Sequence, residues 1–155
     1  MWKKLRPYVL SIAIALAVGG ASALVTNNSM KLYKTLMLPP LAPPGWLFPV
    51  VWTVLFILMG ISAALVWRAD TPDRGTALTV YAAQLVVNFF WPVIFFVFEK
   101  RLFAFIWLIA LLILVIIMIS LFKKSSLAAA YLQIPYVLWL LFAGYLNLAS
   151  YILNG

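Results

Sequence analysis

Cysteine and histidine are absent from this chain of 155 residues, and acidic residues are nearly absent. The only carboxylate side chains are those of Asp70, Asp73 and Glu99, and each lies in a predicted connection between apolar segments. Without thiolate or imidazole, the chain has no ligands for the usual zinc or iron–sulfur sites and no Cys-His or Ser-His-Asp nucleophile. Without a buried carboxylate it offers no acid for an intramembrane proton relay. The sequence therefore argues against a metal hydrolase, a redox carrier and an ion-coupled pump.

Charge is scarce as well, because only 9% of the residues are charged whereas 67% are hydrophobic, and the mean hydropathy is +1.13. Such a composition is typical of a membrane protein. A bilayer core of about 30 Å needs about 20 helical residues to cross it. Five stretches of that length are present, and we expect transmembrane helices near residues 7–26, 45–67, 76–98, 102–122 and 127–153. The predicted fold is all-α, a single five-helix transmembrane domain spanning residues 1–155, because such continuous apolar runs lack the alternation of barrel strands.

The first apolar run has some features of a cleavable signal peptide. Three basic residues precede it, and Ala21-Ser22-Ala23 resembles a cleavage site. The apolar character continues through Leu24 and Val25, which makes the run long enough to span a bilayer. We therefore expect a retained helix.

Basic residues divide unequally between the two predicted membrane faces. Seven lie on the face of the N-terminus (Lys3, Lys4, Arg6, Arg68, Arg74, Lys123 and Lys124) and four on the other (Lys31, Lys34, Lys100 and Arg101). This excess predicts a cytoplasmic N-terminus. The net charge of +8 is scattered over helix ends on both faces, which favours lipid headgroups over nucleic acid as its partner.

Neutral amides and large rings recur at helical spacing within three of the predicted spans. The stripes are Trp52, Phe56 and Met59 in the second span, Gln84, Asn88, Trp91 and Phe95 in the third, and Tyr136, Trp139, Ala143 and Asn147 in the fifth. Residues spaced in this way share one face of a helix, so the three stripes could enclose one cavity. The alternative is that the amides only join helices by hydrogen bonds, each worth about 1 kcal/mol in a membrane bundle. Periodicity alone leaves both interpretations open.

Prolines precede the second span and interrupt later ones. Four of them, at positions 39, 40, 43 and 44, stiffen the approach to the second span, so this loop could cover a cavity as a lid. Pro92 and Pro135 each remove an amide hydrogen within or near the start of a span, which can open space between helices. The fourth span is aliphatic through its middle, and we expect it to face lipid or another subunit.

Three ordered sequence blocks carry a family resemblance. The run PLAPPGWLFPVVWTVLFILMG from Pro40 to Gly60 resembles the signature of the translocator protein family, also called tryptophan-rich sensory proteins or peripheral benzodiazepine receptors. The blocks QLVVNFFW, from Gln84 to Trp91, and PYVLW, from Pro135 to Trp139, resemble the third and fifth helices of that family. The three blocks occur in order and are spread along almost the full length of the chain.

The resemblance implies a five-helix bundle, often a homodimer, that binds protoporphyrin IX or a related tetrapyrrole and in some members sterols or benzodiazepine-site ligands. It also implies the binding residues. By motif position the cavity would be lined by Trp52, Phe56, Asn88, Trp91, Trp139, Ala143 and Asn147, with Tyr33 at its lid and Trp46 at its mouth. Bacterial members have been linked to light-dependent porphyrin breakdown, and Trp52 and Trp139 would then be the catalytic electron donors. The porphyrin would be ligand or substrate, and no cofactor or metal is expected.

Two departures limit the resemblance. Leu32 precedes Tyr33 where a Trp-Tyr pair is common, and no Lys or Arg follows Lys124, so the sterol motif on the fifth helix is unsupported. For the porphyrin carboxylates, Lys31 and Lys34 are candidate contacts, although both could simply meet water or headgroups.

Three functions follow as alternatives. The first is a porphyrin-binding sensor or scavenger with possible photochemical turnover, and the second is an uncoupled translocator of porphyrins or other apolar ligands. In the third, the protein is structural and its aromatic stripes only pack helices.

Small-residue repeats at Ala15, Gly19 and Ala23 and at Gly60 and Ala64 allow close helix packing, within a subunit or between subunits.

Overall fold

Five helices long and apolar enough to cross a membrane dominate the computed structural model, which describes residues 1–155 and contains no strands. The elements in chain order are α1 (Trp2–Val25), α2 (Ser29–Thr35), α3 (Leu47–Ala69), α4 (Arg74–Pro92), the π-helix η1 (Val93–Val97), α5 (Arg101–Ser125), α6 (Leu127–Leu132) and α7 (Ile134–Asn154). The third span consists of α4 and η1, and the fifth of α6 and α7. The predicted fold class is confirmed.

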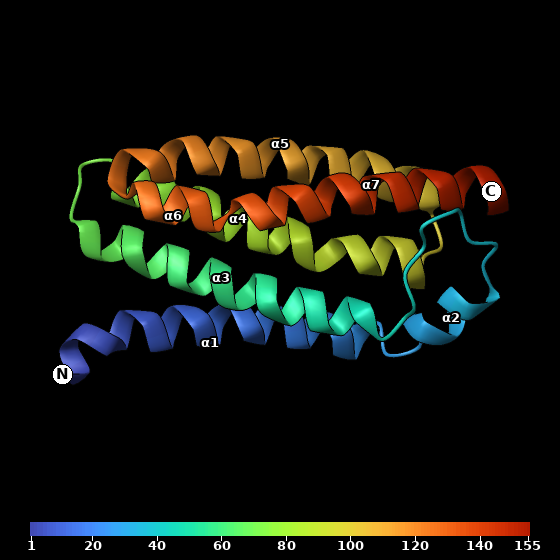
Figure 1. The fold of residues 1–155 in the computed structure, drawn as a ribbon, viewed down its shortest axis with the longest axis horizontal. Coiled ribbons are helices and arrows are strands. Elements are labelled where there is room, and N and C mark those ends of the chain that lie inside the picture. Colours follow the sequence, from blue (N-terminus) through green and yellow to red (C-terminus); the bar gives the residue numbers. More distant parts are fainter.

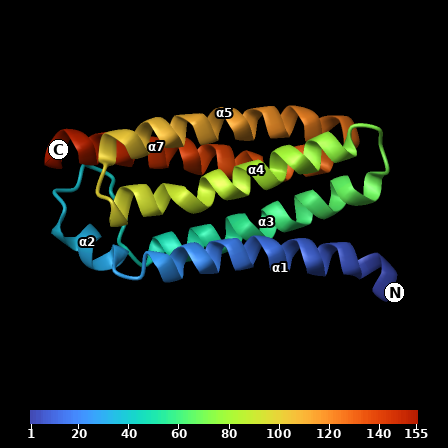
Figure 2. The same ribbon diagram turned by 180° about the vertical axis from the view of Figure 1, so that it is seen from behind.

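The helices form an elongated bundle with the N-terminus at one end and the C-terminus and α2 at the other (Figure 1). Helices α1 and α3 lie side by side, α5 and α7 lie together opposite them, and α4 contacts both groups (Figure 2). The short helix α2 lies in the connection between α1 and α3, a segment that was predicted as a loop without a helix.

Helix α5 has one face inside the bundle and one outside. Its buried residues recur every four and three positions: Ala104, Leu108, Leu111, Val115, Met118 and Phe122. This heptad spacing lines one side of the helix, which packs against α4 and α7. On the outer side Ile106 and Ile113 are more than half exposed, as expected of a surface that faces lipid.

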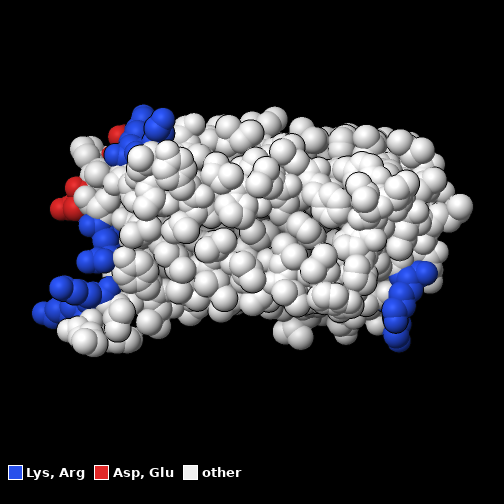
Figure 3. All heavy atoms as spheres, viewed as in Figure 1, with Lys and Arg blue, Asp and Glu red and all other residues white.

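Charged side chains lie at the two ends of the bundle, because every charged residue is near a helix end or in a connection, and the face shown in Figure 3 is uncharged between those ends. The N-terminal end carries Arg68, Asp70 and Arg74 near the α3–α4 connection, and the α2 end carries Glu99 and Arg101 between η1 and α5. An uncharged belt around helices of this length is the surface that a bilayer requires. The chain is therefore an integral membrane protein.

Close packing characterises the N-terminal half of the bundle. A Cβ atom placed on Gly60 would lie 2.5 Å from the Cα of Ile12, so α3 approaches the backbone of α1 as only glycine permits. Nearby, the Ser62 hydroxyl donates a hydrogen bond of 2.7 Å to the carbonyl of Ala129 on α6. The small residues Gly60 and Ala64 are both buried, and Gly60 packs against a helix of its own chain.

A buried polar chain joins α4 to α7 at mid-bundle. The Asn88 amide donates to the Tyr136 hydroxyl over 2.5 Å, and that hydroxyl donates to Gln84 Oε1 over 2.8 Å. Both amides thus make the interhelical hydrogen bonds that membrane helices use for association. In contrast, the Gln133 side chain is fully buried and makes no hydrogen bond.

Candidate ligand-binding site

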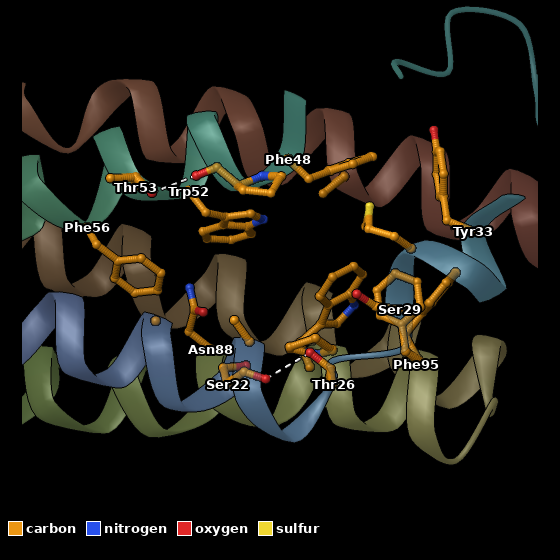
Figure 4. A pocket seen from close by; sticks show the side chains of 18 of the residues that line it. Ser22, Thr26, Ser29, Tyr33, Phe48, Trp52, Thr53, Phe56, Asn88 and Phe95 are labelled. Atoms are coloured by element: carbon orange, nitrogen blue, oxygen red, sulfur yellow. Dashed lines mark hydrogen bonds between the residues drawn. The ribbon is translucent and has the colours of Figure 1, made fainter. Parts of the chain in front are cut away.

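A cavity of about 480 Å³ occupies the half of the bundle nearest α2. Its 25 lining residues come from α1, α2, α3, α4, η1, α7 and the α1–α2 connection, and none of them is charged. Figure 4 shows side chains of α3 facing those of α1 and α4 across the space. The volume falls within the range of about 300–1,000 Å³ that is usual for small-molecule sites.

Large rings on α3 and α7 hold this end of the bundle open. Helix α3 packs closely against α6 but hardly approaches α7, because indoles occupy the space between them. The ring of Trp52 lies 6.4 Å from that of Trp139 in a perpendicular arrangement, and Phe48 lies 5.9 Å from Trp139. Such edge-to-face contacts stabilise aromatic clusters beyond the area they bury. The α3–α7 wall of the cavity is therefore a preorganised set of ring faces and edges.

Pro92 and the π-helix that follows it shape a second wall. Because Pro92 cannot donate a hydrogen bond, the α-helical ladder is interrupted there, and η1 continues with a bond from Phe98 N–H to the Val93 carbonyl. Phe95 and Phe96 both line the cavity, and Phe95 stacks on Trp91 at 5.4 Å. This segment matches the prediction that Pro92 disturbs its span.

Hydrogen bonds fix the orientation of Trp91. Its indole N–H donates to Asn147 Oδ1 over 3.0 Å, and the Asn147 amide donates to the Arg101 carbonyl over 2.8 Å. The Asn147 side chain thus joins α4, α5 and α7 at the cavity wall. Both of its polar ends are engaged within the protein.

The loop that contains α2 covers the cavity at the end of the bundle. Tyr33 donates a hydrogen bond of 2.5 Å to the Pro43 carbonyl and contacts Phe48 edge-on at 5.1 Å. Burial raises the pKa of the Tyr33 hydroxyl, which keeps it a neutral donor. Farther along, the Tyr145 hydroxyl donates to the Pro40 carbonyl over 2.6 Å, and so ties the loop to α7. The predicted lid is a structured cover attached at both sides.

Some polar groups of the cavity are engaged within the protein, whereas the side chains of Asn27, Ser29 and Ser150 line it without a hydrogen bond. Ser22 and Thr26 donate their hydroxyl hydrogens to backbone carbonyls. Asn88 points into the space between α1 and α3 (Figure 4) and carries a second amide hydrogen beyond the one given to Tyr136. The Trp139 indole N–H is buried and has no partner. The cavity can therefore take a largely apolar, aromatic molecule that makes a few hydrogen bonds to neutral side chains.

All of the predicted binding residues except Trp46 line this one cavity, namely Tyr33, Trp52, Phe56, Asn88, Trp91, Trp139, Ala143 and Asn147. Trp46 precedes α3, is 68% exposed, and does not line the cavity. Lys31 and Lys34 are exposed and also lie outside it.

Sequence reasoning missed the contribution of α1. Leu16, Gly19 and Ala23 line the cavity, yet α1 carries no stripe of rings or amides that would have indicated this role. The sequence signal that existed was the small-residue repeat that contains Gly19 and Ala23. The structure gives its reason, because a Cβ atom on Gly19 would lie 2.6 Å from the Phe56 ring. Phe48 was also missed, although it lies within the proline-rich block that suggested the site.

Fold and cavity together define a class, the helical membrane proteins with an aromatic cavity inside the bundle. Comparison with known proteins makes this assignment specific. The TspO/MBR family model matches residues 11–152, and the chain belongs to this family.

Relatives from distant organisms support the assignment. The chain is 36% identical to the tryptophan-rich protein TspO of Chlorobaculum tepidum, with 99% of each chain covered. It is 36% identical to the protein of the same name from Archaeoglobus fulgidus, over 95% of this chain and 96% of the relative. It is 31% identical to the translocator protein of Homo sapiens, over 94% of this chain and 87% of the relative.

Proposed function

We propose that this protein binds protoporphyrin IX or a related tetrapyrrole in the aromatic cavity and acts as a membrane sensor or scavenger of such molecules. The observation that carries the proposal is the uncharged cavity of about 480 Å³ between ring-bearing helices. A flat apolar macrocycle can stack on indole and phenyl faces there, and such binding needs no side chain that coordinates a metal. The same surfaces suit benzodiazepine-site ligands, which are also aromatic and carry few polar groups.

Photochemical breakdown of the bound porphyrin is the catalytic part of the proposal, with Trp52 and Trp139 as electron donors. One electron would pass from an indole to the photoexcited macrocycle, which gives an indole radical cation and a porphyrin radical anion. Dioxygen would then take the electron from the macrocycle and become superoxide, and the indole would recover its electron by oxidising porphyrin. The net reaction is oxidation of porphyrin by dioxygen, with the tryptophan regenerated.

A titration in darkness followed by illumination separates binding from turnover. Protoporphyrin IX should quench tryptophan fluorescence in the dark, and its Soret band should then decay under light. Trp139→Phe should slow that decay by about tenfold while dark binding persists, because phenylalanine retains a ring face but is a far poorer electron donor. Trp67→Phe is the matched control, since Trp67 does not line the cavity. Equal decay rates in both variants would remove the catalytic role, and absence of dark quenching would remove the binding role.

Transport is the second candidate, favoured by the relatives named translocator protein. Movement would be uncoupled from ions, because the spans carry no carboxylate. Uptake of protoporphyrin into proteoliposomes, compared with protein-free vesicles, tests it. In this conformation α3 packs closely against α1 and α6, so the cavity is confined to the α2 end of the bundle. Passage of a ligand to the other end would therefore require these helices to separate.

A bacterial cell-membrane location, a cytoplasmic N-terminus and homodimerisation complete the proposal. Because the chain has no cysteine, single cysteine variants can report topology without interference. Lys34→Cys should react with an impermeant maleimide in intact cells, and Lys123→Cys should react only after lysis. The reverse pattern would invert the orientation. Light scattering on the purified protein measures the oligomeric state.

A further inference from the structure

A second cavity of about 480 Å³ adjoins the aromatic one at the α2 end of the molecule. It lies among the α1–α2 connection, α2 and the end of η1, and four residues line both cavities: Thr26, Asn27, Ser29 and Phe96. The two cavities therefore share a wall, and a ligand with an arm long enough to pass these residues would reach both.

The two cavities differ sharply in chemistry. The aromatic cavity has no charged lining residue, whereas the second is lined by Lys31 and Glu99 together with neutral polar side chains of Asn27, Asn28 and Thr35. An amphipathic molecule with a flat apolar body and an ionised arm matches this division. Its body would be desolvated among rings, and its charge would stay in a polar, partly hydrated space.

The two charges in the second cavity are not equivalent. Glu99 lies 3.8 Å from the Arg101 guanidinium, so its negative charge is compensated within the protein. Lys31 makes no ion pair, and its ammonium group is free to meet an external anion. The lysine three positions later, Lys34, lines neither cavity. The second cavity therefore presents one uncompensated cation, which favours an anionic group over a cationic one.

We propose that the second cavity is a carboxylate subsite, in which Lys31 binds an ionised carboxylate arm of the ligand whose apolar body occupies the aromatic cavity. The inference rests on the proposed binding function and adds the class of ligand: an amphipathic aromatic anion with its charge at one edge. Lys31 and Lys34 were both candidates for this contact from the sequence, and only Lys31 lines the second cavity. The neighbouring Glu99 would disfavour ligands with several negative charges crowded at that edge.

The test compares protoporphyrin IX with its dimethyl ester, which keeps the macrocycle but replaces both ionised carboxylates by neutral methyl esters. Binding is measured by fluorescence quenching in nanodiscs of zwitterionic lipid, so that anionic headgroups do not compete for the lysine. Lys31→Gln should weaken binding of the diacid by about two- to fivefold, the range expected for one partly exposed ion pair, and leave binding of the ester unchanged. Lys34→Gln is the matched control on the same helix and should alter neither.

A second variant gives the opposite sign. Glu99→Gln removes a negative charge from the cavity and releases Arg101 from its pairing, so the diacid should bind about twofold more tightly while the ester does not respond. Raising the salt concentration should reduce both effects. Lys31, Lys34 and Glu99 are all exposed, and their variants should keep the melting temperature of the parent protein.

The outcomes separate the two proposals. If the parent protein binds both probes but Lys31→Gln leaves the diacid unaffected, or weakens acid and ester equally, the carboxylate subsite is wrong and the aromatic site stands. If neither probe quenches the parent protein, the binding function fails and the subsite fails with it. A selective loss of diacid binding in Lys31→Gln, absent in Lys34→Gln, supports the subsite.

Discussion

The two ends of the bundle use the same helices in different ways. At the N-terminal end, Gly60, Ser62 and Ala64 of α3 are buried, and α3 packs closely against α1 and α6. At the α2 end, Phe48 and Trp52 of the same helix face Trp139 of α7 across aromatic contacts. Small side chains let backbones approach, whereas rings hold them apart and leave room beside them. The cavity is therefore a consequence of residue size along α3.

The largest expected effect comes from filling the closest helix contact. Gly60→Ala should destabilise the protein by about 1–3 kcal/mol, because its Cβ would collide with the Ile12 backbone, which cannot rotate away. Thermal unfolding in detergent measures the change. Gly20→Ala is the matched control at the open end, where a Cβ meets no atom within 4 Å. It should be neutral or stabilising by up to about 1 kcal/mol, given the helix propensities of the two residues. Equal losses would mean that the two ends are packed alike.

The next effect concerns the polar chain between the two ends. Tyr136→Phe removes the hydroxyl that links Asn88 to Gln84 and leaves both amides without that partner. The expected loss is about 1–2 kcal/mol of stability. Tyr131→Phe, at a side chain that is 65% exposed, should cost almost nothing. If the two variants have the same melting temperature, the buried hydrogen-bonded chain does not contribute to the association of α4 with α7.

A variant at the cavity wall should affect binding more than stability. Asn147→Leu breaks the hydrogen bonds to Trp91 and to the Arg101 carbonyl, so the indole loses its fixed orientation. We expect about 1 kcal/mol of destabilisation and about a fivefold loss of protoporphyrin affinity. Calorimetry and fluorescence quenching on the same sample measure both. A large loss of stability without any loss of affinity would place Asn147 in the packed core and not at a ligand site.

The smallest effect is expected at the lid. Tyr33→Phe keeps the ring contact with Phe48 but removes the hydrogen bond to Pro43, so ligand release should accelerate by about two- to fivefold with little change in melting temperature. Stopped-flow dissociation measures the rate.

Burial raises the pKa of the Tyr33 hydroxyl in the folded protein above its ordinary value of 10. The resulting contribution to stability is therefore complete below pH 10 and is lost as the pH rises through the raised pKa. Tyr33→Phe should abolish that alkaline loss.

Much of the fold was predictable because hydropathy and helical period are local properties. The positions of Trp52, Asn88 and Trp139 on helix faces followed from spacing alone, and the structure brings these residues to one cavity. Helix α2, the π-helix after Pro92 and the division of the fifth span at Gln133 were not predicted in detail. Each depends on a change in hydrogen-bond pattern over a few residues, which an average over 20 residues does not detect.

By itself, the sequence determined the solvent, the number of spans and the chemistry that this protein lacks, because composition and hydrophobic run length act without reference to distant residues. It also placed amides and rings on common helix faces. Only the tertiary structure decided that α1 completes the cavity, that Trp46 lies outside it and that Lys31 lines an adjoining polar space while Lys34 does not. Those outcomes depend on how far apart the helices stand, and that distance is set by contacts between residues far apart in the chain, such as Gly60 with Ile12.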